Sequence, residues 1–342
     1  MREALQRKIL AFIAEPHAHD FDQLAFELVH YQATSLRAYG RLVEARGGLG
    51  ADWRSAPLVP TDLFRELDLC SHVGASHAVT EFKTSGTTTG RRGVRRVYDL
   101  TLYHAGMMAP FVEHVLAGER TPRPWLSLVP DPADDPASSL SHMVGAIADQ
   151  LAEHVTWVMT PEGLDVERAC ALARASTEPL IIMTTAFALL HWLDGASEAS
   201  MQLPAGSRMM LTGGFKGRAR SVEEPELLAL VKARLGLNPD AVVPEYGMTE
   251  LTSQAYGRPF QAPPWLRLRV VDPEDGADLP CGEVGLVAFF DLLNLDNVSA
   301  LVTGDLGRLD ASGRLTLLGR APGALLRGCS LSAEELGVMA SS

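Results

Sequence analysis

The chain has 342 residues, a formal net charge of -12 at pH 7 and hydrophobic residues at 46% of its positions. This length suits one large domain or two ordinary ones, and the acidic charge argues against nucleic acid or an anionic membrane as the main partner. No stretch has the apolar length of a signal peptide or a membrane span. The four cysteines are scattered without metal-ligand spacing, so we expect a globular protein of the reducing cytoplasm.

Residues 1–80 are predicted to form a helical region, because apolar residues recur there at helical spacing up to about residue 50. An extended segment punctuated by prolines follows. Thr61 or Asp62 is then expected to cap a helix over Leu63–Leu69.

A hydroxyl-rich loop comes next, and the rest of the chain is interpreted around it. The loop consists of Thr84, Ser85, Gly86, Thr87, Thr88, Thr89 and Gly90. Glycines let backbone N–H groups crowd an anion and hydroxyl groups add donors, so the loop suits a polyphosphate. The P-loop motif is excluded, because Arg91 stands where that motif has Lys. The alternative is a flexible polar surface loop. Four arginines follow: Arg91, Arg92, Arg95 and Arg96.

Short apolar strands alternate with helices over residues 81–260, and this predicts an α/β core with a parallel sheet. The strands are expected at Trp125–Val129, Leu180–Thr185, Arg208–Gly214 and Val242–Tyr246. Ligands on such sheets bind at the carboxyl ends of the strands. Residues 261–320 show the alternation and turns of a small antiparallel β subdomain, and residues 321–342 form a C-terminal tail.

Three further stretches supply groups that suit a nucleotide. Tyr246 to Glu250 places an aromatic ring, a hydroxyl and a carboxylate after a strand, although an ordinary turn is the alternative. Asp305 precedes a hairpin and could accept from ribose hydroxyls, or be a common turn residue. Arg320 could contact ribose or phosphate, or lie on the surface.

The order and spacing of these features resemble the adenylate-forming superfamily of acyl-CoA synthetases, luciferases and peptide-synthetase adenylation domains. The resemblance implies the α/β fold of the large N-terminal domain of that family, with ATP and Mg²⁺ as cofactors. Thr249 would touch the α-phosphate and Glu250 would bind magnesium. The residues implied in ATP binding are Thr84, Ser85, Gly86, Thr87, Thr88, Thr89, Gly90, Gly213, Gly214, Tyr246, Gly247, Thr249, Asp305 and Arg320.

The chain differs from full-length superfamily members after Arg320. Those members carry a mobile C-terminal domain of roughly a hundred residues with a lysine used in adenylation. Only 22 residues follow Arg320 here, so we expect that domain to be absent.

Several stretches resemble one branch, the acyl-protein synthetases of bacterial bioluminescence fatty-acid reductase systems. The stretches are Phe21–Ala25, Val59–Phe64, Ser138–Met143, Thr185–Phe187, Leu203–Arg208, Gly213–Arg218 and Arg327–Leu331. The resemblance implies that Cys329 accepts the acyl group, with Arg320 and Arg327 favouring its thiolate. The alternative for Cys329 is a small buried hydrophobic residue.

We therefore expect ATP-dependent activation of a carboxylic acid, a fatty acid by resemblance, followed by transfer to a cysteine thiol. Thr185, Ala186 and Phe187 are expected near the acid. The resemblance implies a partner protein of the acyl-CoA reductase type. One alternative is a biosynthetic ligase that delivers an acyl or aryl acid to CoA, a carrier protein or an amine. The other is a nucleotide-binding subunit without catalysis.

Overall fold

The computed structural model describes residues 1–71, 77–84, 92–196, 201–213 and 223–321. The chain divides into two compact units, each described separately below. The first unit comprises Met1–Gly106, Met248–Gln254 and Pro259–Ser342, and the second comprises Met107–Gly247 and Ala255–Arg258. Among the described residues, no helix combines the length and the apolar character needed to cross a membrane.

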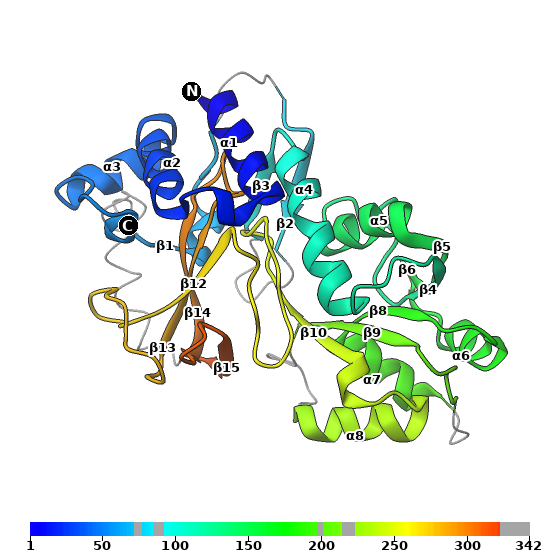
Figure 1. Cartoon of the computed structure of the whole chain (residues 1–342). Helices are drawn as coiled ribbons and strands as arrows, with labels where there is room; N and C mark the ends of the chain where they lie inside the picture. Colours follow the sequence, from blue (N-terminus) through cyan, green and yellow to red (C-terminus); the bar gives the residue numbers. More distant parts are fainter. Residues whose placement is uncertain (72–76, 85–91, 197–200, 214–222, 322–342) are drawn as a thin grey trace. The chain divides into compact units, whose positions relative to one another are not determined.

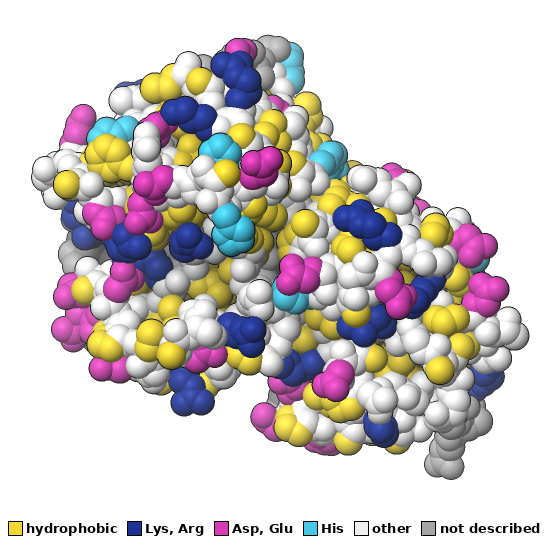
Figure 2. Space-filling view, viewed as in Figure 1, with side chains coloured by type: hydrophobic (Ala, Val, Ile, Leu, Met, Phe, Trp, Pro, Cys, Tyr) yellow, Lys and Arg dark blue, Asp and Glu magenta, His cyan; other side chains and the backbone are white. Residues whose placement is uncertain are grey.

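Charged side chains of both signs are interspersed over the face shown in Figure 2, with hydrophobic side chains between them. The net charge of -12 is therefore not gathered into one acidic patch on that face.

Three helices open the first unit (Figure 1). They are α1 (Arg2–Ala14), α2 (Phe21–Ser35) and α3 (Arg37–Ala45). Asp20 begins α2, because its carboxylate accepts hydrogen bonds from the backbone N–H groups of Asp22 and Gln23. The helices expected from apolar spacing over the first 50 residues are confirmed.

The helix expected over Leu63–Leu69 is wrong. The chain forms a 3-10 helix at Thr61–Arg65 instead, and no side chain caps it. The two preceding residues form the short strand β1 (Val59–Pro60), which pairs with a distant strand, β14 (Ala300–Leu309). The 3-10 helix follows this strand immediately, so the pairing of β1 fixes where the helical segment begins.

The first unit contains the antiparallel strands predicted near the C-terminal end. They are β12 (Leu266–Val271), β13 (Gly285–Asp291), β14 (Ala300–Leu309) and β15 (Leu315–Arg320). The sheet order is β1-β14-β13-β12, with β15 also paired to β14, and only the β1 pairing is parallel. A separate antiparallel hairpin joins β2 (Thr80–Lys83) to β3 (Val94–Val97).

A buried glutamine fastens α2 to the connection between β13 and β14. The side-chain amide of Gln32 donates to the carbonyl of Asn294 at 2.7 Å, the carbonyl of Asn297 at 2.6 Å and the hydroxyl of Ser299 at 2.9 Å. Its carbonyl oxygen accepts from the N–H of Ser299 at 3.1 Å. One side chain thus pairs with four buried polar groups of this connection.

The second unit is built on a six-stranded sheet of order β11-β10-β9-β8-β4-β5. Its strands are β4 (Arg123–Ser127), β5 (Ala152–Trp157), β8 (Ile181–Thr185), β9 (Arg208–Thr212), β10 (Val242–Tyr246) and β11 (Ala255–Tyr256). All neighbours pair in parallel except β11, as expected for strands alternating with helices. A minor hairpin joins β6 (Met159–Thr160) and β7 (Gly163–Leu164).

Helices cover this sheet (Figure 1). They are α5 (Ser139–Leu151), α6 (Val166–Ala175), α7 (Ala186–Gly195) and α8 (Glu224–Leu235). The helix α4 (Thr101–Pro110) runs from the first unit into the second and continues as a π-helical turn at Phe111–Val115.

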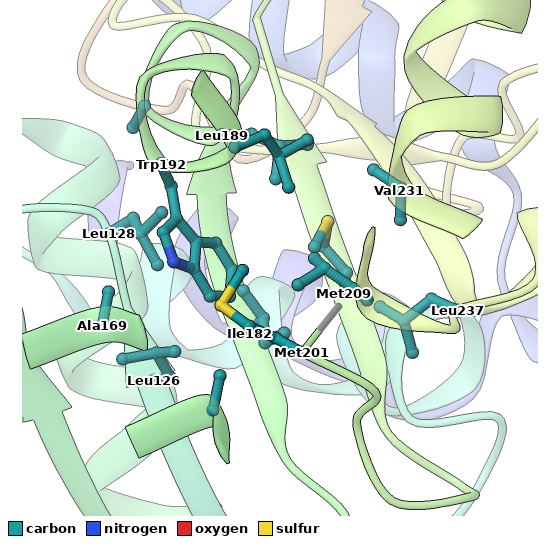
Figure 3. Packing of buried hydrophobic residues seen from close by; sticks show 14 of the residues in the cluster. Leu126, Leu128, Ala169, Ile182, Leu189, Trp192, Met201, Met209, Val231 and Leu237 are labelled. Carbon is teal, nitrogen blue, oxygen red and sulfur yellow. The ribbon is translucent and has the colours of Figure 1, made fainter. Parts of the chain in front are cut away.

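The core of the second unit lies between the sheet and the helices α6, α7 and α8 (Figure 3). Trp192 of α7 is fully buried there, near Ile182 of β8 and Leu126 of β4, while Val231 of α8 packs beside Met209 of β9. Burying these side chains holds the strand ends that carry the predicted ligand residues.

Candidate functional site

The described ends of the hydroxyl-rich loop close on each other in the first unit. The backbone N–H of Thr84 donates to the carbonyl of Gly93 at 2.9 Å, and the N–H of Gly93 donates to the Thr84 hydroxyl at 2.9 Å. A Cβ on Gly93 would lie 3.0 Å from the Thr84 methyl, so this approach favours glycine. The predicted loop residues Ser85, Gly86, Thr87, Thr88, Thr89 and Gly90 lie outside the described residues.

The predicted magnesium ligand lies on a turn of the first unit. Thr249 and Glu250 form this turn, which the Leu251 N–H closes by donating to the Met248 carbonyl at 3.1 Å. Glu250 is buried, and burial raises the pKa of its carboxyl to about 7 although Arg95 opposes the shift. Among the described residues this carboxylate has no ion-pair partner.

The two predicted ribose residues are cross-strand neighbours. Asp305 of β14 lies opposite Arg320 of β15, and the Arg320 Nε lies 3.2 Å from the Asp305 carboxylate. The Asp305 side chain is 5% exposed, and its backbone N–H donates to the Thr303 hydroxyl at 3.0 Å. The sheet register therefore brings together residues that the sequence separates by a hairpin.

In the second unit, polar side chains lie at the carboxyl ends of three adjacent parallel strands, and of these only Thr185 was a predicted site residue. Thr185 ends β8, Thr212 ends β9, and Glu245 lies next to the end of β10, and they are aligned in the sheet register. Gly213 follows β9 with a φ of 71°, a left-handed conformation that favours glycine. The predicted adenine contact, Tyr246, is the last residue of β10. Gly247 follows Tyr246 and is the last residue of this segment of the second unit. Gly214 lies outside the described residues.

The residues expected near the acid form the entry of α7. The Thr185 hydroxyl caps this helix by accepting from the Ala188 N–H at 3.1 Å. Ala186 is buried in the core, whereas Phe187 is 46% exposed. Phe187 therefore offers an aromatic surface beside the strand ends of the second unit.

Glu245 is a buried carboxyl that the sequence did not single out. It accepts a hydrogen bond from the Thr212 hydroxyl, and burial raises its pKa to about 7 against the opposing effect of that bond. The available signal was a single carboxylate within the apolar run Val242–Tyr246, all of which is buried.

The Glu245→Gln variant should be more stable than the wild type at pH 8 by up to about 3 kcal/mol, since each pKa unit is worth about 1.4 kcal/mol. A carboxyl whose pKa is raised on folding stabilises the fold fully below its unfolded pKa. That stabilisation is lost as the pH rises through the folded pKa of about 7. Denaturant titrations at pH 4.5 and pH 8 should show a gap between variant and wild type that opens only at the higher pH. Equal gaps at both pH values would contradict a neutral buried Glu245.

The cysteines differ in exposure. Cys70 and Cys170 are buried, whereas Cys281 is exposed. Burial raises the pKa of the Cys70 thiol to about 12, which keeps it protonated. The predicted acyl acceptor, Cys329, lies outside the described residues.

Sequence reasoning also missed a buried polar cluster in the first unit. Arg95, expected to follow the loop as part of a basic run, is 4% exposed. It donates to backbone carbonyls of the turn that carries Glu250, together with Asn294. Its neighbour Arg96 is on the opposite face of β3 and pairs with surface carboxylates.

The donor set fits magnesium held between a protein and phosphates. No group of three or more metal-ligating side chains occurs in the part of the chain that the structure describes. Magnesium shared with a nucleotide needs only one or two carboxylates, since phosphates and water fill the other positions. The buried Glu250 carboxylate suits that requirement.

The family model described as "Acyl-protein synthetase, LuxE" matches residues 56–336 of the chain. No curated protein sequence matches it significantly.

Solved structures share the fold. ATP-bound MatB from Rhodopseudomonas palustris is 18% identical, with a TM-score of 0.51 over 71% of this chain and 48% of MatB. A double mutant of o-succinylbenzoate CoA synthetase (MenE) from Bacillus subtilis, bound with a product analogue, is 19% identical, with a TM-score of 0.50 over 71% of this chain and 49% of MenE. Both belong to the adenylate-forming superfamily, so the predicted fold is confirmed. The chain spans about half the length of the structures it matches.

Proposed function

The chain belongs to the LuxE acyl-protein synthetase family, and from this premise we propose that it activates a carboxylic acid with ATP and transfers the acyl group to a thiol. In the first half-reaction the carboxylate attacks the α-phosphorus, giving acyl-adenylate and pyrophosphate. In the second, a thiolate attacks the acyl carbon, giving a thioester and AMP. The family match over residues 56–336 carries the proposal.

Within the first unit, the turn and the β14–β15 pair would hold the nucleotide. The Glu250 carboxylate would bind Mg²⁺ and the Thr249 hydroxyl would donate to the α-phosphate. Asp305, kept in place by Arg320, would accept from ribose hydroxyls. Bound Mg²⁺ supplies positive charge that stabilises the phosphates. The contribution of this chain is mainly positioning and electrostatic stabilisation of the charge that develops during attack.

Within the second unit, Tyr246 would face the adenine, and Gly213 and Gly247 would bring bare backbone close to it. Thr185, Ala186 and Phe187 would lie near the acid. The exposed Phe187 ring suits an apolar acid chain, so we propose a fatty acid as substrate. The family name implies a protein acceptor, and we propose Cys329 for this role, followed by delivery to a partner of the acyl-CoA reductase type.

Acid-dependent exchange of labelled pyrophosphate into ATP tests the first half-reaction. A panel from acetate to long-chain fatty acids, with aryl acids included, should give exchange that rises with chain length. Absence of exchange with every acid would show that the chain does not form an adenylate. Formation of acyl-CoA on addition of CoA, without labelling of the protein, would favour a biosynthetic ligase instead.

The Asp305→Ala variant should raise the KM for ATP about 10- to 100-fold, since a hydrogen bond to a charged group is worth about 1.5–3 kcal/mol. The effect should appear in ATP titrations of pyrophosphate exchange at saturating acid. Asp310→Asn is the matched control, because Asp310 lies on the turn of the same hairpin and its Oδ1 accepts from Ser312 and Arg314 of that turn. An unchanged KM in Asp305→Ala would place the ribose elsewhere.

A further inference from the structure

The turn that carries the predicted metal ligand is fixed through its backbone carbonyls. The carbonyl of Thr249 accepts from Arg95 Nη1 at 3.3 Å, and that of Leu251 accepts from the same nitrogen at 2.7 Å. The intervening carbonyl of Glu250 accepts from Asn294 Nδ2 at 2.9 Å. Three consecutive carbonyls are therefore held by side chains from distant parts of the first unit.

The other terminal nitrogen of Arg95 extends the same network. Arg95 Nη2 donates to the hydroxyl of Thr252 and to Asn294 Oδ1, the latter at 3.2 Å. The Thr252 hydroxyl itself lies 2.7 Å from Asn294 Oδ1, and the Thr252 N–H donates to this oxygen at 3.0 Å. The guanidinium thus spans the turn on one side and the connection after β13 on the other.

Asp291 is the buried acidic residue of the same network. Its carboxylate accepts from the N–H groups of Thr252 and Ser253 at 3.0 and 2.9 Å, and from the Ser253 hydroxyl at 2.8 Å. Burial lowers the pKa of the Arg95 guanidinium, and attraction to Asp291 is the largest effect that opposes this shift. Burial likewise raises the pKa of the Asp291 carboxyl, against the hydrogen bonds that it accepts. A charge buried this deeply is stable only when it is paired and hydrogen-bonded.

The position of Arg95 on β3 connects this hydrogen-bond network to the hydroxyl-rich loop. Arg95 lies in β3 opposite Phe82 of β2, and these two strands form the hairpin that leads into and out of the hydroxyl-rich loop. The ends of that loop close at Thr84 and Gly93, two residues before Arg95. One side chain therefore connects the base of the loop to the Thr249–Glu250 turn.

We infer that Arg95 is a positioning residue that holds the Thr249–Glu250 turn at a fixed position relative to the base of the hydroxyl-rich loop. The inference rests on the proposed function, because the turn matters for catalysis only if Thr249 and Glu250 serve the nucleotide. Arg95 touches no substrate atom in this scheme. It acts through the backbone of the turn, and the geometry of the turn sets where the Glu250 carboxylate meets the metal ion.

Lysine cannot replace arginine in this role. The planar guanidinium presents two nitrogens that donate in different directions at once, whereas the single ammonium group of lysine is a point charge on a flexible chain. Arg95→Lys keeps a positive charge at this position but loses the second nitrogen of the guanidinium. The variant therefore tests the hydrogen-bond geometry of Arg95 separately from its positive charge.

The experiment compares Arg95→Lys with Arg96→Lys, a matched control on the same strand whose side chain pairs with Asp68 and Glu81 at the surface. We expect Arg95→Lys to lower kcat for pyrophosphate exchange about 10- to 100-fold and to raise the Mg²⁺ concentration for half-maximal rate several-fold. The KM for the acid should stay within about twofold. Arg96→Lys should match the wild type in all three quantities.

Hydrogen exchange gives a readout that does not depend on activity. Amide protection in the peptide Met248–Gln254 should fall at least about tenfold in Arg95→Lys, while peptides from α5 and α6 keep wild-type protection. If Arg95→Lys does not fold, Thr252→Val removes the hydroxyl that Arg95 Nη2 contacts, and it should shift kcat and protection in the same direction by a smaller factor.

The outcomes separate the inference from the proposed function. A wild-type chain that catalyses exchange, together with a folded Arg95→Lys variant of unchanged kcat, Mg²⁺ dependence and protection, would overturn the positioning role. A wild-type chain without exchange would overturn the proposed function, while loss of protection in Arg95→Lys would still show that Arg95 fixes the turn.

Discussion

Replacing Glu250 with Gln is expected to lower acid-dependent pyrophosphate exchange by about 100-fold or more while the chain stays folded. The amide is close in shape to the carboxylate but carries no charge for a divalent cation. The carboxylate is buried, so water cannot take over its role with equal effect. Initial rates at saturating ATP, acid and Mg²⁺ measure the loss.

Thermal stability distinguishes this loss from unfolding. Because burial raises the pKa of Glu250 to about 7, ionising it above that pH costs free energy in the fold. Glu250→Gln should therefore melt at the same temperature as the wild type or higher at pH 8, with activity lost. Glu226→Gln, an exposed change on α8, should alter neither property.

The same pKa predicts a pH dependence of metal use. The wild type should need more Mg²⁺ as the pH falls below about 7, because protons compete for the Glu250 carboxylate. In Glu250→Gln this contribution should disappear. Near-normal exchange in that variant at every pH would show that the metal ligand lies elsewhere.

Replacing Cys329 with Ser should abolish covalent labelling of the chain by a radioactive fatty acid while acid-dependent pyrophosphate exchange continues. A serine hydroxyl is far less ionised than a cysteine thiol and does not form the thioester. Incubation with ATP, Mg²⁺ and the labelled acid, followed by denaturation and hydroxylamine treatment, measures the thioester. The first half-reaction needs no thiol, so exchange serves as the internal control.

The other cysteines provide matched controls of different exposure. Cys281→Ser is the most demanding one, because Cys281 is exposed and accessible to a reactive adenylate. The buried Cys70 and Cys170 should be silent. If Cys281→Ser removes the label and Cys329→Ser keeps it, the acceptor has been assigned to the wrong cysteine.

Local patterns predicted much of the second unit. The apolar runs ending at Thr185 and Tyr246 were expected strands, and the sheet register places them on either side of β9 with their carboxyl ends at the same edge. Such runs are punctuated by Gly and Pro, so their limits are visible in the sequence. Strand β1 was missed, because two residues become a strand only by pairing with β14, more than 200 positions later.

Arg95 shows why part of the site was not predicted. Its charge suggested a solvated position beside the loop, but alternation along β3 places it on the same face as the buried Val97. A predicted strand over these residues would have shown that Arg95 and Val97 share a face. The partners that make burial possible, Asp291 and Asn294, lie about 200 residues away, and nothing local reveals them.

The hydrogen bonds of Gln32 determine where the chain can be truncated without loss of buried contacts. The region shared across the family begins at residue 56, yet Gln32 lies on α2, outside it. Cutting the chain at that point would leave the backbone carbonyls of Asn294 and Asn297 without their buried donor, beside the connection that also holds the Glu250 turn. The segment that the family model matches is thus smaller than the compact unit to which Gln32 belongs.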